Sequence, residues 1–347
     1  MGKPISPVER LRKLDDVLGG GKTMLIAMQD NPDPDAIAAA AALREIAKKR
    51  HQIVCSLGHG GVVGRAENQA LLRYLALNPR PLDGIDLERF DRIALVDAQP
   101  GTGNVSLPAD LRLDVVIDHH PVRKRTRSAH YTDIRRSYGA TATILHQYLT
   151  AADIPIEPRL ATALLYGIRS DTQDFGREAT RADIDAHIAL YPYANLRALA
   201  RIESAPLPRE YFSTLRRALA SATLYDDRVT CYLGELESPD MVAVTADLLL
   251  RVEGVTWSLS IGAVGDYLHA SLRTTSAKPS AGEVAHRLAG KRGFGGGHAA
   301  LAAAQIPLLE AEREAKQRER LIARLVRRFL NATGPNSRSG EPLAGID

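Results

Sequence analysis

The sequence of 347 residues predicts an α/β protein: a doubly wound parallel sheet forms the N-terminal domain, and a smaller α/β domain follows it. Short apolar segments alternate with helical segments over residues 24–167, which is typical of a sheet whose consecutive strands run parallel. After a connector with three prolines at residues 191–208, the chain enters a second strand-rich region. Ligands of such open sheets bind at the carboxyl ends of the strands.

The N-terminal domain is expected to begin with an amphipathic helix at residues 8–18, which three consecutive glycines end. The apolar strand at residues 24–28 runs into a loop in which Pro32 and Pro34 exclude a helix. An alanine-rich helix then covers residues 36–49. The alternation continues with strands at residues 53–57, 92–96 and 113–117, and with helices at residues 67–77, 141–149 and 160–167.

The predicted domain boundaries give a first domain at residues 1–190, a helical linker at 191–225 and a second domain at 226–308. The linker contains a helix at residues 209–219. The second domain contains strands at 229–233, 256–263 and 267–273, and a helix at 241–250. Residues 309–347 hold a charged helix, 310–330, and a tail rich in Gly, Pro and Ser that we expect to be disordered. Leu321, Leu325 and Phe329 recur at helical spacing, so this helix packs either on the body or on the second subunit of a homodimer.

The composition restricts the classes of partner and compartment. A net charge of +4 and a pI of about 9.0 favour an anionic partner, although a solvated basic surface explains them equally well. No segment approaches the roughly 18–20 apolar residues of a membrane span, and residues 1–18 lack the apolar core of a signal peptide. Cys55 and Cys231 are far apart and have apolar neighbours, so we interpret them as buried thiols of a cytoplasmic protein.

Aromatic residues make up only 5% of the chain, so a long groove of stacking rings for a single strand is not indicated. Basic residues do gather at one place, shortly after the two histidines discussed below: Arg123, Lys124, Arg125, Arg127, Arg135 and Arg136. Beside a metal site they would attract phosphate. Taken alone, an exposed loop is the simpler interpretation.

Acidic residues stand where several predicted strands or helices end. Asp33 and Asp35 flank a proline in front of the alanine-rich helix, and one carboxylate is enough to cap that helix. Asp97 ends the strand at residues 92–96, where a turn residue would be ordinary. Asp171 follows the helix at residues 160–167, where an ion pair with Arg169 would explain it. Each carboxylate carries little information by itself.

The most informative stretch is Asp118-His119-His120, which follows a run of β-branched residues that predicts a buried strand. Adjacent histidines at the end of such a strand are unusual as core residues. In a strand they would point to opposite faces, so we expect one to ligate a metal and the other to reach the substrate. Asp118 can hold an imidazole in the required tautomer.

Together these residues predict a site for two divalent cations. Two cations about 3.5–4 Å apart can stabilise both the attacking and the leaving oxygen of a phosphoryl group. Carboxylates combined with some imidazole suit Mn²⁺ or Mg²⁺ better than zinc. The joint pattern is far more specific than any one of its members.

A glycine-rich stretch, Gly293-Phe294-Gly295-Gly296-Gly297-His298, lies near the end of the second predicted domain. Three consecutive glycines allow close approach of the backbone to a ligand, and their N–H groups can bind an anion. A flexible turn between helices is the alternative. His298 at its edge and Arg273, which ends a predicted strand, favour the anion site.

These motifs together resemble the DHH phosphoesterase family with its DHH-associated C-terminal domain, over roughly residues 24–305. The first motif of the family matches the segment from Asn31 to Ala36, and the second matches Asp97. The third motif, which names the family, is Asp118-His119-His120, and the fourth is Asp171 within Gly-Ile-Arg-Ser-Asp-Thr. The glycine-rich motif of the associated domain matches Gly295-Gly296-Gly297-His298.

The resemblance implies a catalytic domain at residues 1–190 and a substrate-binding domain at 226–308 that faces it across a cleft. It implies two Mn²⁺ ions, with Mg²⁺ as an alternative, and attack on phosphorus by a metal-activated water. It places Asp33 on one ion, Asp35 and His119 on the other, and Asp97 between them. Asp171 would complete the site and His120 would contact the phosphate, while Arg273, Gly295, Gly296, Gly297 and His298 would bind the rest of the substrate.

One departure concerns the metal ligands. The family usually carries a histidine four residues before the first aspartate of the first motif, and here that residue is Gln29. An amide oxygen is the weaker ligand, so the first ion is expected to bind more loosely unless Asp30 compensates. A second departure is a missing glycine after Ala302–Ala304.

The resemblance and the size favour hydrolysis of short oligonucleotides or small nucleotide phosphates: nanoRNA, dinucleotides or adenosine 3′,5′-bisphosphate. A cyclic-dinucleotide phosphodiesterase and a RecJ-like single-strand exonuclease remain alternatives. An inorganic pyrophosphatase would share the first domain, but the glycine-rich stretch opposes it. Gln29 also leaves open a non-catalytic nucleotide-binding regulatory protein. Against that reading, converging carboxylates repel one another when no cation is bound.

Overall fold

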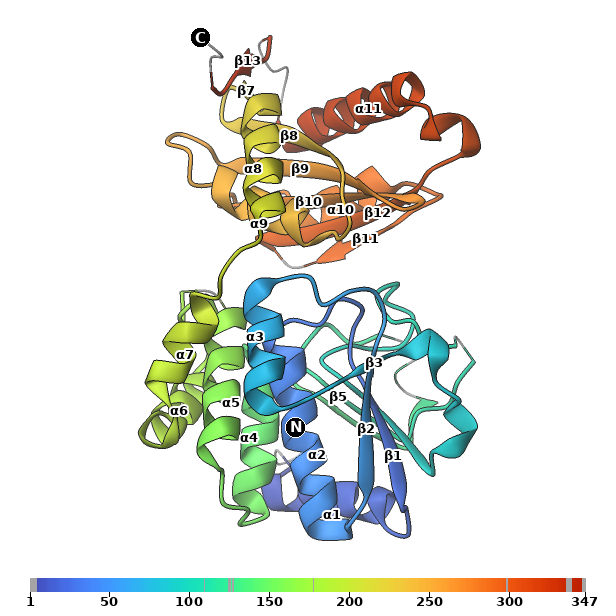
Figure 1. The fold of residues 1–347 in the computed structure, drawn as a ribbon, viewed down its shortest axis with the longest axis vertical. Coiled ribbons are helices and arrows are strands. Elements are labelled where there is room, and N and C mark those ends of the chain that lie inside the picture. Colours follow the sequence, from blue (N-terminus) through green and yellow to red (C-terminus); the bar gives the residue numbers. More distant parts are fainter. Residues whose placement is uncertain are drawn as a thin grey trace. The chain divides into compact units, whose positions relative to one another are not determined.

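The computed structural model describes residues 5–108, 110–123, 126, 128–176, 178–297, 299–334 and 339–344. It forms two compact units, Met1–Pro206 and Leu207–Asp347, each with its own sheet and core (Figure 1).

The N-terminal unit is built on a six-stranded sheet in the order β3-β2-β1-β4-β5-β6, and its neighbouring strands pair in parallel. The predicted parallel sheet is therefore confirmed. The strand order reverses between β1 and β4, which creates a topological switch point at the carboxyl ends of these two strands. The strands are β1 (Thr23–Ala27), β2 (Val54–His59), β3 (Arg80–Pro81), β4 (Arg92–Val96), β5 (Val115–Asp118) and β6 (Tyr131–Ile134).

Helices cover one face of this sheet, and α2 is the most buried of them (Figure 1). Its alanines, residues 38–42, present little side-chain volume, so α4 and α5 pack closely against it. The opposite face is covered by a smaller apolar layer around Leu25, Ile93 and Val116, to which loops and short 3₁₀ turns contribute. The helices are α1 (Pro7–Leu18), α2 (Pro34–His51), α3 (Ala66–Leu75), α4 (Thr141–Ala151), α5 (Pro158–Asp171), α6 (Arg181–Leu190) and α7 (Leu196–Glu203).

The C-terminal unit contains a seven-stranded sheet in the order β11-β12-β10-β9-β8-β7-β13, which is antiparallel except for the parallel pair β8–β9. Its strands are β7 (Thr223–Tyr225), β8 (Arg228–Glu235), β9 (Trp257–Val264), β10 (Tyr267–Thr274), β11 (Phe294–Gly297), β12 (Leu301–Pro307) and β13 (Glu341–Pro342). Its helices are α8 (Arg209–Ser221), α9 (Asp240–Leu249), α10 (Ala281–Ala289) and α11 (Ala315–Thr333).

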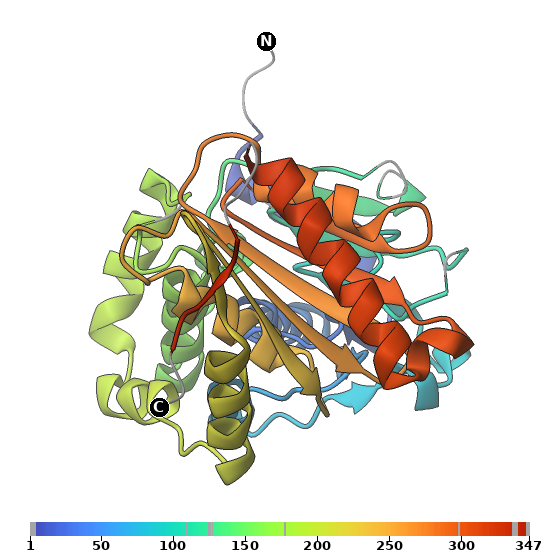
Figure 2. The same ribbon diagram turned by 90° about the horizontal axis from the view of Figure 1, so that it is seen from above.

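Helix α11 lies across the strands of this sheet, as Figure 2 shows. Leu321, Leu325 and Phe329 are buried, and the ring of Phe329 lies 6.0 Å from that of Trp257. Of the two alternatives for the predicted apolar row, packing on the chain's own body is therefore the observed one. The helix begins at Ala315 because residues 310–313 form a 3₁₀ turn.

The expected disorder of residues 331–347 is wrong for part of that tail. Glu341 and Pro342 pair with β7, and the N–H of Leu343 donates to the carbonyl of Ala222 at 2.9 Å. Leu343 also packs in the small core beside β8, so local composition is outweighed by pairing at a sheet edge. Residues 335–338 and 345–347 lie outside the described part of the chain.

Both cysteines are free thiols; Cys231 is buried as predicted, whereas Cys55 is only half-buried. Within the described ranges, no helix combines the length and apolar character needed to cross a bilayer.

Candidate metal centre

The predicted site residues of the N-terminal unit gather at the carboxyl edge of its sheet. Asp33 and Asp35 follow β1, and Asp97 follows β4, so they flank the switch point. Asp118 is the last residue of β5, and Asp171 is the last residue of α5. The predicted strand ends therefore do converge, and α5 runs four residues beyond its predicted end at residue 167 to carry Asp171.

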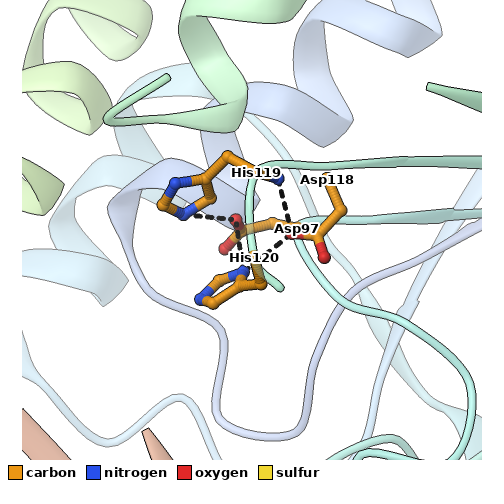
Figure 3. A group of neighbouring side chains, drawn as sticks. All are labelled: Asp97, Asp118, His119 and His120. Atoms are coloured by element: carbon orange, nitrogen blue, oxygen red, sulfur yellow. Dashed lines mark hydrogen bonds and ion pairs between the residues drawn. The ribbon is translucent and has the colours of Figure 1, made fainter. Parts of the chain in front are cut away.

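The two histidines do not point to opposite faces, so that expectation is wrong. Strand β5 ends at Asp118, and the alternation of a strand no longer applies to the residues after it. The rings of His119 and His120 lie 4.3 Å apart. Nε2 of His119 and Nδ1 of His120 lie 3.7 Å and 3.9 Å from the same Oδ1 of Asp97 (Figure 3).

Hydrogen bonds at Nδ1 set the tautomer of both imidazoles. His119 Nδ1 lies 3.1 Å from the carbonyl oxygen of Tyr138, which can only accept, so this nitrogen carries a proton. Nε2 of His119 then faces Asp171 Oδ2 at 2.9 Å. His120 Nδ1 contacts Asp118 Oδ1 at 2.7 Å, the kind of contact that was expected of Asp118.

Two groups of side chains could each hold a metal ion. Asp97, Asp118, His119 and His120 form one group, and Asp35, His119 and Asp171 form the other. In each group the possible ligand atoms lie within 4.8 Å of one another. Carboxylate oxygens with some imidazole nitrogen match the preferences of a hard or borderline divalent cation.

Asp33 and Asp35 both contact helix N-termini. Oδ1 of Asp33 accepts from Ala36 N–H at 3.0 Å, so the capping role is real. Asp35 instead accepts from the N–H groups of Thr141 and Ala142, at 2.7 and 2.8 Å, at the start of α4. The helix dipole and two donors hold this fully buried carboxylate in place.

Crowding of these carboxylates raises their pKa values. Burial raises the pKa of Asp97 well above its ordinary value, and the charges of Asp35 and Asp33 raise it further. Burial, followed by the charge of Asp171, raises the pKa of Asp35 to about 7. At neutral pH, therefore, protons neutralise part of the negative charge of the site.

The pKa of His119 is raised as well, whereas that of Asp118 is lowered. Burial alone would lower the pKa of His119, but its hydrogen bond to Asp171 and the nearby carboxylates raise it to about 10. Burial alone would raise the pKa of Asp118, but the hydrogen bond and charge of His120 lower it to about 2. In the absence of a metal, protons on His119, Asp35 and Asp97 offset the negative charge of the carboxylates. A divalent cation could replace these protons, so the residues present suit such an ion.

Asp97 also has an unusual backbone, with φ at 56°. This left-handed conformation is uncommon outside glycine, although Asp and Asn tolerate it better than most residues. Oδ1 of Asp97 accepts from the hydroxyl of Thr141 at 2.9 Å. Strained residues of this kind concentrate at functional sites.

Gln29 lies beside Asp33, where the family usually has histidine. Its Nε2 donates to Asp33 Oδ2 at 3.0 Å, and its Oε1 accepts from Asn104 at 3.1 Å. A carboxylate only accepts, so the amide nitrogen faces Asp33. Asp30 does not compensate, because its two oxygens accept from the N–H and the hydroxyl of Ser106, at 2.9 and 3.0 Å.

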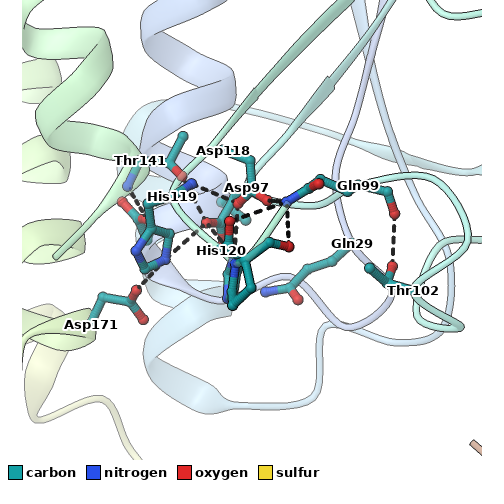
Figure 4. A network of polar contacts seen from close by, with 12 residues as sticks. Gln29, Asp97, Gln99, Thr102, Asp118, His119, His120, Thr141 and Asp171 are labelled. Carbon is teal, nitrogen blue, oxygen red and sulfur yellow. Dashed lines mark hydrogen bonds and ion pairs between the residues drawn. The ribbon is translucent and has the colours of Figure 1, made fainter. Parts of the chain in front are cut away.

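Sequence reasoning missed Gln99, which is fully buried between the strand ends (Figure 4). Its Nε2 donates to Asp118 Oδ2 at 2.6 Å, and its Oε1 accepts from Arg123 N–H and the Thr126 hydroxyl, both at 2.7 Å. The sequence offers no signal for it beyond a polar residue two positions after Asp97. Thr141 was also missed, although a threonine at a predicted helix start is a signal for an anion.

Arg169 does not explain Asp171. Its guanidinium pairs with Asp174 at 2.6 Å and with Glu203 at 3.0 Å. Arg135 does not belong to a basic rim either, because it is 9% exposed and pairs with Asp133 at 2.7 Å. Two other residues of the expected rim, Arg123 and Arg136, are exposed, whereas Lys124, Arg125 and Arg127 lie outside the described residues.

The predicted substrate residues of the C-terminal unit have structural contacts of their own. Gly295, Gly296 and Gly297 form β11 and pair with β12, so the alternative of a flexible turn is wrong. A Cβ atom at Gly295 would lie 2.4 Å from the carbonyl oxygen of Ala285, so α10 packs directly on this strand. Arg273 pairs with Asp247 at 2.5 Å. His298 lies outside the described residues.

Comparisons with known proteins match a family model to each of the two units. The family model of the DHH family N-terminal domain matches residues 23–168, and that of the DHHA1 domain matches residues 226–328. An uncharacterized protein of Methanocaldococcus jannaschii is 37% identical over 287 residues, which are 82% of this chain and 58% of that protein.

A protein of Deinococcus radiodurans named probable manganese-dependent inorganic pyrophosphatase is 33% identical over 175 residues, 48% of this chain and 52% of its own length. The chain thus spans little more than half the length of these curated relatives. A solved structure of an exopolyphosphatase-related protein from Bacteroides fragilis has a TM-score of 0.70 at 14% identity, and covers 95% of this chain and 98% of its own. That likeness shows the fold. With both of its domain models matched in order, the chain belongs to the DHH phosphoesterase family.

Proposed function

We propose that the protein is a metal-dependent phosphoesterase that hydrolyses short oligonucleotides or small nucleotide phosphates. The observation that carries this proposal is the convergence of carboxylates from β1, β4 and α5 on the imidazoles after β5 at the switch point. A pyrophosphatase relative is named as manganese-dependent, which favours two Mn²⁺ ions, with Mg²⁺ as the alternative.

We assign the carboxylates and His119 to the two ions. Asp33 would hold one ion, Asp35 and His119 the other, and Asp97 would lie between them, with Asp171 completing the set. When bound, two divalent ions supply an activated water and neutralise charge on the phosphoryl group. Gln29, with its amide nitrogen toward Asp33, would have to rotate before its oxygen could reach an ion.

His120 is the group we assign to the phosphate. Its Nδ1 is held by Asp118 at 2.7 Å, so the ring keeps one orientation and one tautomer. Gln99 in turn holds the other oxygen of Asp118. An imidazole fixed in this way can donate a hydrogen bond to a phosphoryl oxygen or deliver a proton to a leaving group.

The DHHA1 domain supports a nucleotide substrate over inorganic pyrophosphate. The similarity to the pyrophosphatase of Deinococcus radiodurans covers only 48% of this chain, whereas the DHHA1 model matches residues 226–328 as well. We assign binding of the nucleotide portion to Arg273, His298 and the glycines of β11. Inorganic pyrophosphate remains a second candidate because of that relative.

The test is hydrolysis with added Mn²⁺ of a 5′-phosphorylated dinucleotide, adenosine 3′,5′-bisphosphate, a cyclic dinucleotide, long single-stranded DNA and pyrophosphate. Release of mononucleotide from the first, abolished by Asp97→Asn and retained by Asp86→Asn on an exposed 3₁₀ turn, is the expected result. Turnover of pyrophosphate alone would support the second candidate. Absence of turnover of every compound, with Mg²⁺ also tried, would overturn the proposal.

A further inference from the structure

The exposed face of α11 carries arginines in a regular row. Arg320, Arg324 and Arg327 are exposed and stand four and three residues apart, so their side chains lie on one face of the helix. The sequence of α11 holds six basic residues and one acidic residue, Glu319. The row borders a groove with a volume of about 380 Å³, whose lining residues are Glu312, Gln317, Arg320, Ala323, Arg324 and Arg327.

Glu312 lines one side of this groove. It is 7% exposed and accepts from Leu309 N–H at 3.0 Å, from Arg292 at 2.8 Å and from Arg324 at 3.2 Å. Its carboxylate is therefore already occupied, and it fixes Arg324 in place. Across the described part of the chain, no carboxylate lies within ion-pair distance of Arg320 or Arg327.

The row does not suit a lipid surface. A helix binds a bilayer by its apolar face, but the apolar face of α11 is buried against its own sheet. Leu321, Leu325 and Phe329 are each at most 4% exposed. Only the charged face of the helix is available to a partner.

We propose that this arginine row binds the phosphate backbone of a single-stranded oligonucleotide. The planar guanidinium matches a phosphate group with two parallel hydrogen bonds. From Arg320 to Arg327 the helix rises about 10 Å, at ~1.5 Å per residue, which exceeds the reach of one phosphate. A ligand with successive phosphates therefore fits better than a free anion.

The groove has no aromatic residue among those that line it. Contacts would then be made to the backbone and not to stacked bases, so binding is expected to be nearly independent of base sequence. The choice of a single strand over a duplex rests on the proposed function, because the short oligonucleotides proposed as substrates do not form stable duplexes.

The test uses the full chain in EDTA, so that no metal-dependent cleavage occurs, and a fluorescein-labelled single-stranded oligouridylate followed by anisotropy at several salt concentrations. The double variant Arg320→Gln/Arg327→Gln is expected to bind at least about tenfold more weakly. Its slope of log K against log salt is expected to be shallower by about 1.4, at ~0.7 per lost phosphate contact. Arg216→Gln, at an exposed position of α8, is the matched control and is expected to bind as the parent does.

Replacement of both arginines by lysine keeps the charge but removes the planar guanidinium groups. An affinity between those of the parent and the glutamine variant therefore supports guanidinium–phosphate contacts. Equal affinity and equal salt slope for the parent and the glutamine variant would overturn the inference. So would tighter binding of a duplex, or arginine-dependent binding of anionic phospholipid vesicles without binding of the oligonucleotide. Dinucleotide hydrolysis with Mn²⁺, measured in parallel, separates this inference from the proposed function, because either can fail while the other stands.

Discussion

Gln99 and Asp118 are joined by a hydrogen bond of 2.6 Å, and both side chains are fully buried. Asp118 uses its other oxygen to hold Nδ1 of His120. The amide of Gln99 also fixes the start of the following loop through the N–H of Arg123. The orientation of His120 therefore depends on a residue that would contact neither metal nor substrate.

Replacement of Gln99 by leucine should leave the fold in place and reduce catalysis. We expect kcat to fall by roughly 10- to 100-fold, as when groups that orient metal ligands are removed, with a smaller change in KM. The free energy of unfolding should fall by about 1–3 kcal/mol because buried partners of the amide lose their hydrogen bonds. Steady-state hydrolysis with Mn²⁺ and urea unfolding measure the two effects.

Thr102→Val is the control for Gln99→Leu, because the Thr102 hydroxyl bonds only the backbone carbonyl of Gln99, at 2.8 Å. It should retain kcat close to that of the parent. An unchanged kcat and pH profile in Gln99→Leu would contradict the positioning role.

Asp97→Asn replaces a carboxyl whose pKa is raised by burial and by the neighbouring carboxylates, so the metal-free protein no longer has to take up a proton here as it folds. Asparagine tolerates the left-handed backbone at this position, and it can still accept from Thr141. We expect the variant to unfold at a higher temperature than the parent in EDTA, and to gain less on addition of Mn²⁺. Thermal unfolding with and without the metal tests this, and an identical parent Tm in EDTA and Mn²⁺ would contradict a metal site here.

The metal-free protein should lose stability as the pH rises above about 4. Asp35 has its pKa raised from 3.8 to about 7, so between these values the folded state binds more protons than the unfolded state. His119, with its pKa raised from 6.5 to about 10, extends the same trend to higher pH. Asp118 acts oppositely, but only at low pH, since its stabilising effect is lost as the pH falls toward about 2.

Urea unfolding in EDTA at pH 5 and pH 8 checks this pH dependence, with the lower stability expected at pH 8. Mn²⁺ competes with the protons that these groups bind, so its affinity should rise over the same range. Stability that increases from pH 5 to pH 8 without metal would show that other groups dominate.

Gln29→His restores the residue that the family usually carries. The amide now donates to Asp33, whereas an imidazole would offer a nitrogen to an ion held there. We expect tighter binding of the Mn²⁺ ion at Asp33, by about 10- to 100-fold, with the ion at Asp35 and His119 little changed. Calorimetric titration of parent, Gln29→His and Gln29→Ala measures this, and two equally tight ions in the parent would show that glutamine is already an adequate ligand.

Gly295→Ala should destabilise the C-terminal unit whether or not a ligand is present. The added methyl would lie 2.4 Å from the carbonyl oxygen of Ala285, so α10 or β11 must move. A cost of about 1–3 kcal/mol is expected from such overpacking. Gly84→Ala, at an open position without a left-handed backbone, is the control for an added methyl group without a clash. Equal stability of the parent and Gly295→Ala would contradict this role.

The sequence predicted the elements whose signal is local. The apolar strands before Asp33, Asp97 and Asp118 and the alanine-rich helix between the first two are each defined by composition over a few residues. Once these strands are parallel, their carboxyl ends must share one edge, so the convergence of the acidic residues follows from topology.

What the sequence could not show depends on contacts between distant segments. Glycines are poor strand formers, and β11 exists because β12 pairs with it and α10 packs on it. The side on which His119 lies follows from the end of β5 and from the carbonyl of Tyr138, neither of which has a local signal. Gln99 is polar and buried because its side chain bonds Asp118, Arg123, Thr126 and the backbone carbonyls of His120 and Pro121.

The candidate metal centre draws on segments that lie far apart between Asp33 and Asp171. During synthesis, Asp97, Asp118, His119 and His120 leave the ribosome before α5 does, whereas the group of Asp35, His119 and Asp171 stays incomplete until α5 follows. A metal ion held by Asp35, His119 and Asp171 therefore binds the finished domain and not an early segment of it. A nascent chain that ends before α5 would carry Asp35 and His119 without Asp171, so one of the two candidate ion sites would be incomplete in it.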